Sequence, residues 1–312
     1  MNQILVVGSL NTDLVVRAPR FPRPGETISG EDLQIIAGGK GANQAVAAAR
    51  LGAQVSMLGR VGKDNFGDFL LDHLKSNHVD TTLVQRDDAS TGTSIIVVDS
   101  NGQNSIVLSA GANGKVTPAD VSDVSFSDFQ VVLLQLEIQI ETVARAAQRA
   151  HENGLRVILN PAPAQPIPDE LIAVSDFIIP NETELSLLTN QIVTDIQSAE
   201  QAAHVLLQRG ARNVIVTMGS RGALMVSNTR VDMYTSTHVN TYQVEVVDTT
   251  AAGDAFIGGF AFALLQDKSL EEAVCYGCAC GALATTRFGA QPSLPTKDEV
   301  ERLLSQYRQG DR

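Results

Sequence analysis

The stretch QVVLLQLEIQIETVARAAQRAHENGLRVILN, residues 130–160, indicates the fold of the chain. It begins with an apolar run (130–137), continues through a helical pattern (141–152) and ends on a second apolar run (155–160). Continuous apolar runs of this length are typical of parallel strands that are buried on both faces. The stretch therefore predicts a strand–helix–strand unit whose two strands lie in one parallel sheet.

The same alternation extends in both directions along the chain. Further strands are expected at ILVVG (4–8), QVSMLG (54–59), DFIIPN (176–181) and NVIVTMG (213–219), and further helices at 41–52, 66–77 and 196–209. The pattern predicts an α/β fold in which helices flank both faces of a central, mostly parallel sheet. Ligands of such folds bind outside the carboxyl ends of the strands, so polar residues at those ends are candidate site residues.

Two segments depart from this alternation. Residues 14–39 carry three prolines and a turn at Pro24-Gly25, and residues 91–113 have the pattern of a hairpin around an Asn-Gly turn. We expect these segments to form a small β-sheet lid over a pocket, within a single domain that spans residues 1–312. Such a sheet would expose an apolar face if left alone, so it also predicts a homodimer through the lid.

The composition excludes two classes of partner. The 312 residues carry a formal net charge of −12, and an acidic surface repels the phosphodiester backbone of nucleic acids. The N-terminal stretch MNQILVVGSLNTD lacks the features of a secretion signal, and no apolar run reaches the roughly 18 residues of a membrane span. We therefore expect a cytoplasmic protein that binds neither nucleic acid nor membrane.

Three familiar signatures do not apply. The P-loop pattern fails because Met57 stands where its first glycine would be, and no G-x-G-x-x-G follows the first strand. Cys275, Cys278 and Cys280 include a C-x-x-C spacing, but no histidine or second cysteine pair lies near them. We interpret these cysteines as small apolar residues of a packed helix.

Two polar motifs in the first fifty residues are candidate binding sites. In AGGKGANQA (37–45), adjacent glycines let backbone amides approach a ligand at the start of a helix, and Lys40 and Asn43 add donors. In GSLNTD (8–13), which we expect to end the first strand, Asn11 and Asp13 would share one face and suit a polyol. The alternatives are an ordinary loop-to-helix turn and a polar turn with a capping aspartate.

The stretch DTTAAGDAF, residues 248–256, is the strongest candidate for chemistry. The small residues at 251–253 would let successive amides face inward at a helix N-terminus, which makes an anion hole for a transferring phosphoryl group. Asp254 could then take the proton of a substrate hydroxyl beside that hole. The alternative is an aspartate in a first helical turn that is stabilised only by the helix dipole.

These motifs resemble those of the ribokinase family of carbohydrate and nucleoside kinases. NPAPA (160–164), PNETE (180–184) and TMGSRGA (217–223) complete the family's order and spacing, and the resemblance extends to GAQPS (289–293). It implies a ribokinase-like fold and ATP-dependent phosphorylation of D-ribose at the 5-hydroxyl, giving ribose 5-phosphate. The alternatives are a kinase for 2-deoxyribose or another sugar or nucleoside, and a non-catalytic sugar-binding protein on the same fold.

The resemblance also implies roles for individual residues. Asp254 would be the general base, beside an anion hole formed by the amides of Ala251, Ala252 and Gly253. Together with Asp254, the residues that hold ribose would be Asn11, Asp13, Gly39, Lys40, Asn43 and Glu137. The residues that line the ATP site would be Asn181, Thr217, Gly219, Ser220, Gly222, Gly253 and Cys278.

Two cations follow from the same resemblance. Glu184 would organise Mg²⁺ through water, as the partner of ATP. A potassium ion would activate the enzyme from a site beside the anion hole, formed by Asp248, Thr250, Ala284, Arg287, Gly289 and Ser293. Oxygen-rich cages of this kind suit hard cations. The alternative role of Asp248 is to cap the helix that follows it.

Overall fold

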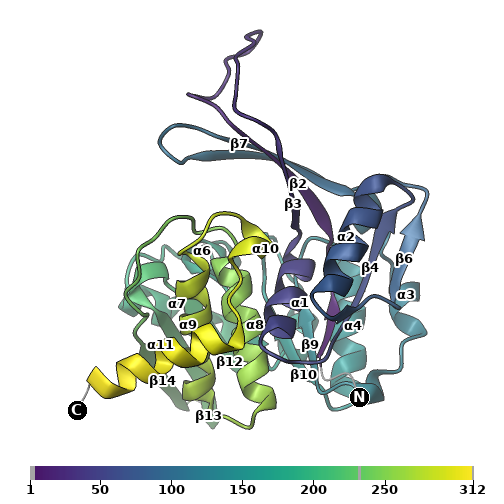
Figure 1. Cartoon of the computed structure of the whole chain (residues 1–312). Helices are drawn as coiled ribbons and strands as arrows, with labels where there is room; N and C mark the ends of the chain where they lie inside the picture. The colour runs from purple at the N-terminus through teal and green to yellow at the C-terminus, as the bar shows by residue number, and fades with distance from the viewer. Residues whose placement is uncertain (1–3, 231–232, 311–312) are drawn as a thin grey trace.

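The computed structural model describes residues 4–230 and 233–310, and its core is one large sheet (Figure 1). The strand order is β14-β13-β12-β11-β10-β9-β1-β4-β5, with β6 paired to β4. The strands are β1 (Ile4–Val7), β4 (Val55–Gly62), β5 (Val79–Asp80), β6 (Val84–Asp87), β9 (Val131–Leu134), β10 (Arg156–Leu159), β11 (Phe177–Ile178), β12 (Asn213–Thr217), β13 (Ala223–Arg230) and β14 (Met233–Val239). All pairs are parallel except β12–β13 and β13–β14. The predicted α/β fold is confirmed.

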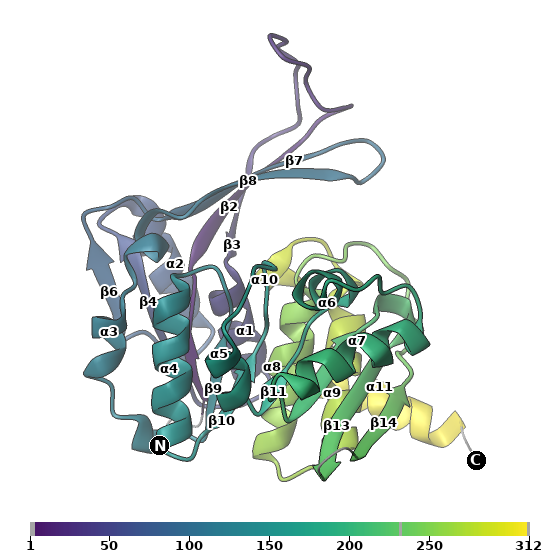
Figure 2. The same cartoon turned by 180° about the vertical axis from the view of Figure 1, so that it is seen from behind.

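Helices cover both faces of this sheet, as Figures 1 and 2 show from opposite sides. One face carries α1 (Lys40–Arg50), α2 (Asn65–Ser76), α8 (Ala252–Leu265), α9 (Leu270–Ala284) and α11 (Lys297–Gly310). The other face carries α3 (Pro118–Ser122), α4 (Ile140–Glu152), α5 (Asp169–Val174), α6 (Glu182–Thr189) and α7 (Ile196–Gln208). The remaining short helices are α10 (Ala290–Ser293), η1 (Gly111–Lys115), η2 (Phe126–Asp128) and η3 (Gly219–Arg221). Within the described residues, no helix combines the length and apolar composition needed to cross a bilayer.

The alternation of side chains along β1 explains the two apolar layers. Ile4 and Val6 join the core on one face of the sheet, and Leu5 and Val7 join the core on the other. The unit of residues 130–160 forms as expected, because β9 and β10 pair in parallel and α4 crosses between them. This crossover places the polar residues that follow β9 and β10 at one edge of the sheet.

A second, smaller sheet rises from the body in Figure 1, and we call it the lid after the predicted role of its segments. Its order is β3-β2-β7-β8, with β2 (Asn11–Arg17), β3 (Gln34–Gly38), β7 (Gly92–Val98) and β8 (Asn104–Ser109). One earlier placement is wrong, because β1 already ends at Val7 and Asn11 begins β2. The chain leaves the central sheet at Gly8 and enters the lid, so Asn11 and Asp13 belong to the lid sheet. Their predicted i, i+2 relation on an extended strand is retained.

Candidate active site

Asp254 lies in the first turn of α8, at the carboxyl edge of the central sheet. Its side chain is buried, and each carboxylate oxygen accepts a hydrogen bond from an amide of α1. Asn43 Nδ2 donates to Oδ2 at 2.9 Å, and Gln44 Nε2 donates to Oδ1 at 3.0 Å. Burial raises the pKa of Asp254, while Lys40 and the two amides act in the opposite direction. A buried, fixed carboxylate with a raised pKa has the properties of a general base.

The residues before Asp254 are small because they border an open space. Ala251 adopts a left-handed conformation with φ 59°, which is rare for a residue with a side chain and is typical of functional sites. A Cβ atom at Gly253 would meet no atom within 4 Å, so this position faces the cavity. Substrate atoms can therefore approach the start of α8 directly.

The available amides differ in one respect from the prediction. The Ala252 amide donates to the Thr249 carbonyl at 3.2 Å, so its predicted place in the anion hole is corrected. The first backbone hydrogen bond of the helix runs from Ala255 N to Ala251 O. The amides of Gly253 and Asp254 precede that bond and are donors that the helix end leaves for a ligand. The Ala251 amide, just before the helix, stays a predicted donor of the anion hole.

The glycine-rich loop before α1 packs tightly against β2. A Cβ atom at Gly38 would lie 2.2 Å from Asp13 Oδ2, and one at Gly39 would lie 2.6 Å from Asn11 N. Gly39 also has a φ of 89°, which favours glycine. These glycines therefore allow the loop to approach Asn11 and Asp13 of the lid. Their predicted contact with a ligand stays a prediction.

Acidic side chains gather around Lys40 on the lid side of Asp254. Glu137 accepts hydrogen bonds from Ser9 Oγ at 2.5 Å and from the Lys40 amide at 3.0 Å. Burial lowers the pKa of the Lys40 ammonium, but neighbouring carboxylates outweigh it and the net shift is upward. Burial is also the main reason that the pKa of Asp13 rises to about 6, against a hydrogen bond from Ser94. The predicted sugar-binding residues thus form one polar cluster.

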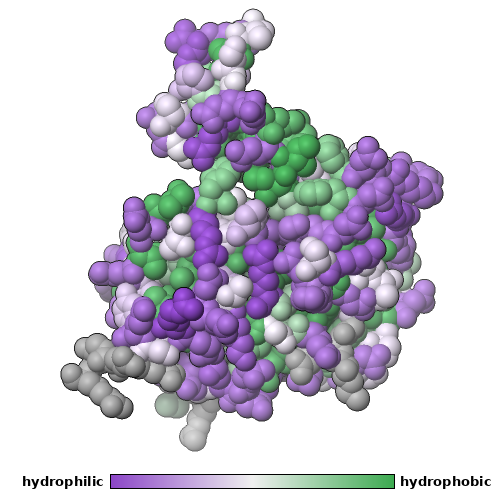
Figure 3. Space-filling model, in the orientation of Figure 1, coloured by the Kyte–Doolittle hydropathy of each residue, from purple (hydrophilic) through white to green (hydrophobic). Residues whose placement is uncertain are grey.

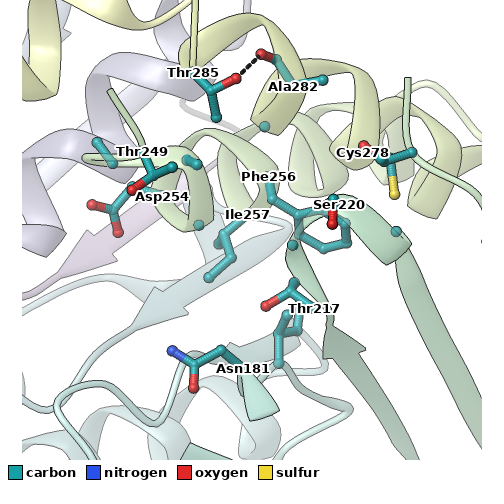
Figure 4. A pocket seen from close by; sticks show the side chains of 18 of the residues that line it. Asn181, Thr217, Ser220, Thr249, Asp254, Phe256, Ile257, Cys278, Ala282 and Thr285 are labelled. Carbon is teal, nitrogen blue, oxygen red and sulfur yellow. Dashed lines mark hydrogen bonds between the residues drawn. The ribbon is translucent and has the colours of Figure 1, made fainter. Parts of the chain in front are cut away.

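A cavity of about 1030 Å³ extends from Asp254 along the carboxyl edge. All of the predicted ATP-site residues line it, namely Asn181, Thr217, Gly219, Ser220, Gly222, Gly253 and Cys278. Figure 4 shows Asp254 on the left and Cys278 on the right of this cavity, with Thr217 and Asn181 below them. Burial raises the pKa of the Cys278 thiol to about 12, so this cysteine is an apolar wall residue. Residues 241–244 and Val246 also line the cavity.

Glu184 lies on the cavity wall in the first turn of α6. It forms a capping box with Asn181, in which Glu184 Oε2 accepts the Asn181 amide at 2.8 Å and Asn181 Oδ1 accepts the Glu184 amide at 2.8 Å. Burial raises the pKa of the Glu184 carboxyl, and Lys40 opposes this shift. In the part of the chain that the structure describes, no three His, Cys, Asp or Glu side chains are grouped to hold a metal by themselves.

Asp248 connects the loop before α8 to the loop before α10. Its Oδ1 accepts the Thr250 amide and hydroxyl, and its Oδ2 accepts the Gly289 amide at 2.9 Å. These hydrogen bonds outweigh burial and lower the pKa of Asp248. Ser293 Oγ donates to the Ala290 carbonyl. The structure thus brings Asp248, Thr250 and Gly289 together, with the Gly289 amide directed at the carboxylate.

A family model of the pfkB family carbohydrate kinases matches residues 1–297, which is nearly the whole chain. The chain belongs to this family of carbohydrate kinases. It is 42% identical over 304 residues to a ribokinase of Haemophilus influenzae, covering 96% of this chain and 98% of the relative. It is 39% identical over 306 residues to a deoxyribokinase of Salmonella typhi, covering 97% and 98%.

A solved structure agrees with this assignment. An Arabidopsis thaliana ribokinase complexed with ribose and ATP superimposes on this carbohydrate kinase with a TM-score of 0.89, at 34% identity. The match covers 97% of this chain and 98% of the plant protein. The ribokinase-like fold expected from the motifs is thereby confirmed.

Several polar residues of this carbohydrate kinase were missed by sequence reasoning. Asn113 Nδ2 donates to Asn11 Oδ1 at 2.7 Å, and Gln44 contacts Asp254. Gln44 follows Asn43 in the quoted glycine-rich motif, and that neighbourhood was the only available signal. Asn113 closes the segment that was assigned to the lid, where nothing in its spacing indicated a partner 102 residues away.

Proposed function

We propose that this carbohydrate kinase transfers the terminal phosphoryl group of ATP to the 5-hydroxyl of D-ribose and releases ribose 5-phosphate and ADP. The observation that carries the proposal is the position of Asp254. It is buried and held by two amides where the large cavity meets the polar cluster of Asp13 and Glu137. A non-catalytic sugar-binding protein would not need a base and helix amides at that point.

In the proposed reaction, Asp254 accepts the proton of the sugar hydroxyl as that oxygen attacks the terminal phosphorus. The amides of Gly253 and Asp254 stabilise the negative charge of the transferring group. Asn43 Oδ1 is buried and, among the described residues, has no hydrogen-bond partner, so it can accept a sugar hydroxyl beside the base. Asn11, Asp13, Gly39, Lys40 and Glu137 complete the sugar site in this proposal.

Glu184 is the residue that would hold Mg²⁺, through water. Its buried carboxylate lines the cavity and keeps one oxygen outside the capping bond to Asn181, which fits a hydrated cation. When bound with ATP, Mg²⁺ neutralises phosphate charge. Asn181, Thr217, Gly219, Ser220, Gly222 and Cys278 line the proposed nucleotide site.

A potassium site at Asp248 is part of the proposal. The contact of Asp248 with Thr250 and Gly289 supports it. The carbonyls of Ala284, Arg287 and Gly289 and the Ser293 hydroxyl would come from the end of α9, the loop that follows it and α10. An ion there would stabilise the loop that leads into α8. Its expected effect is therefore on kcat, through the geometry of the anion hole.

The lid is the proposed dimer interface. Ile35, Ile95 and Val107 lie side by side across the lid strands and are 50%, 53% and 65% exposed. Leu14 completes this row, on the face opposite Asp13, and Figure 3 shows apolar surface on the lid. A second copy that packs its own lid against this row would cover both apolar faces.

The sugar is the part of the proposal that most needs a direct test, because relatives named ribokinase and deoxyribokinase are similar to this chain at 42% and 39% identity. A panel of D-ribose, 2-deoxyribose, other pentoses, hexoses and nucleosides should be incubated with ATP and Mg²⁺, and the products identified by mass spectrometry and NMR. We expect D-ribose to give the highest kcat/KM, with phosphate on the 5-oxygen. A higher kcat/KM for 2-deoxyribose would assign the chain to the alternative sugar.

A further inference from the structure

Three side-chain amides form a buried relay behind Asp254. We call Gln44, Gln135 and Asn160 the amide relay. Gln44 Nε2 donates to Asp254 Oδ1 at 3.0 Å and to Asn160 Oδ1 at 3.2 Å. Gln135 Nε2 donates to Gln44 Oε1 at 2.6 Å. Gln44 and Gln135 are fully buried, and they come from α1 and from the end of β9.

A backbone carbonyl fixes the direction of every amide in the relay. Asn160 Nδ2 donates to the Ile179 carbonyl at 3.0 Å, and a carbonyl can only accept. Asn160 must therefore turn its oxygen toward Gln44. Gln44 must in turn present its NH₂ group to Asn160 and Asp254, and its oxygen to Gln135. The donor that reaches Asp254 is thus determined by the backbone at the end of β11.

The surrounding chain is built around these polar groups. A Cβ atom at Gly8 would lie 2.1 Å from Gln135 Oε1, so a side chain after β1 would displace the Gln135 amide from its present position. Helix α1 is otherwise rich in alanine and buried from Gly41 to Ala49. A buried amide there carries a desolvation penalty that an apolar side chain would avoid. Stability alone does not account for Gln44.

We propose that Gln44 is a positioning residue for phosphoryl transfer, held by Gln135 and Asn160 so that it fixes the plane of the Asp254 carboxylate. Asn43 holds one oxygen of that carboxylate and Gln44 holds the other, so the two bonds together prevent its rotation. Positioning of a base within a fraction of an ångström is a large part of its effect. The inference rests on the proposed role of Asp254 as the base.

The relay should also affect the pKa of Asp254, because several charged groups face this carboxylate. Lys40, at the start of α1, favours the ionised carboxylate. Glu137 after β9, Asp13 on β2 and Glu184 on α6 oppose it, together with burial. Removing the Gln44 Nε2 donor leaves the three carboxylates and the burial of Asp254 unchanged. The pKa of Asp254 should then rise further, and the base should lose its proton only at higher pH.

The test is Gln44→Met, which keeps the length of the side chain and removes its donors. The rate of phosphoryl transfer should be measured by single-turnover rapid quench with ribose and ATP across the acid range. We expect the rate to fall about tenfold to hundredfold, as for the loss of a hydrogen bond to a charged group. We also expect the acid limb of the pH profile to move to higher pH, with KM for ribose and ATP within about threefold of wild type.

A matched control and a second variant separate positioning from stability. Thr142 lies in α4, and Thr142→Val removes its buried hydrogen bond to the Val116 carbonyl, so this variant should lower the melting temperature without moving the acid limb. Gln135→Met acts on Asp254 only through Gln44 and should give a smaller change in the same direction. If Gln44→Met fails to fold, Gln135→Met decides the question by the same readouts.

Two results would overturn the inference. One is a wild-type transfer rate in Gln44→Met or, if that variant fails to fold, in Gln135→Met. The other is a lowered rate with an unmoved acid limb. Asp254→Asn distinguishes these from failure of the proposed base: if Asp254→Asn is inactive while the relay variants behave as wild type, only the relay is refuted.

Discussion

Asp13 shows, at the scale of a residue, how the proposed sugar site opposes stability. Its folded pKa of about 6 exceeds its unfolded value mainly because of burial, so the fold favours the protonated form. The stability that this preference provides is full at pH values below the unfolded pKa and is lost as the pH rises through about 6. At neutral pH the ionised carboxylate therefore destabilises the ligand-free protein.

We predict that Asp13→Asn stabilises the ligand-free protein by roughly 1–3 kcal/mol near neutral pH. The gain should shrink as the pH is lowered toward about 5, which calorimetry can follow. The same variant should raise KM for ribose far more than KM for ATP, because the negative charge and one of the two acceptor oxygens of the carboxylate are replaced by an NH₂ donor. Equal effects on the two KM values would place Asp13 outside the sugar site, and a lower stability at neutral pH would contradict the raised pKa of its carboxyl.

At the scale of elements, the sequence predicts regular structure better than contacts. The unit β9–α4–β10 could be predicted because its apolar periodicity is local. The start of β2 could not, because the turn at Gly8 depends on packing against Gln135, which is distant in the chain. The relay was missed for the same reason: Gln44 meets Gln135 and Asp254 across 91 and 210 residues. The Ala252 amide was misassigned because a local bond to the Thr249 carbonyl uses it.

The two loops that Asp248 connects give a prediction at the same scale. Potassium should raise kcat over a sodium or Tris background, because the occupied site would fix the loop that leads to the anion hole. Asp248→Ala should abolish this response, as measured by steady-state kinetics with the ion rigorously excluded and then restored. A wild-type activity that is independent of potassium would leave Asp248 with only the loop-connecting role seen here.

At the scale of the whole molecule, the exposed lid predicts a dimer. Val107→Lys would place a charge in the apolar row and should convert the protein to a monomer, measured by size exclusion with light scattering at micromolar concentration. Ile192→Lys is the matched control, since Ile192 is 85% exposed in the segment between α6 and α7 and belongs to no lid strand, and this variant should remain dimeric. A wild-type protein that is monomeric and fully active under these conditions would contradict the proposed interface.

The most direct test of the proposed mechanism is the turnover of Asp254→Asn with ribose and ATP. The substitution keeps the size of the side chain and removes its ability to take a proton. We predict that kcat falls by roughly 10²–10⁴-fold, the usual contribution of a positioned base. Ribose binding, measured by calorimetry, should stay within a few-fold of wild type. Turnover near the wild-type rate would contradict the assignment of Asp254 as the base and the mechanism built on it.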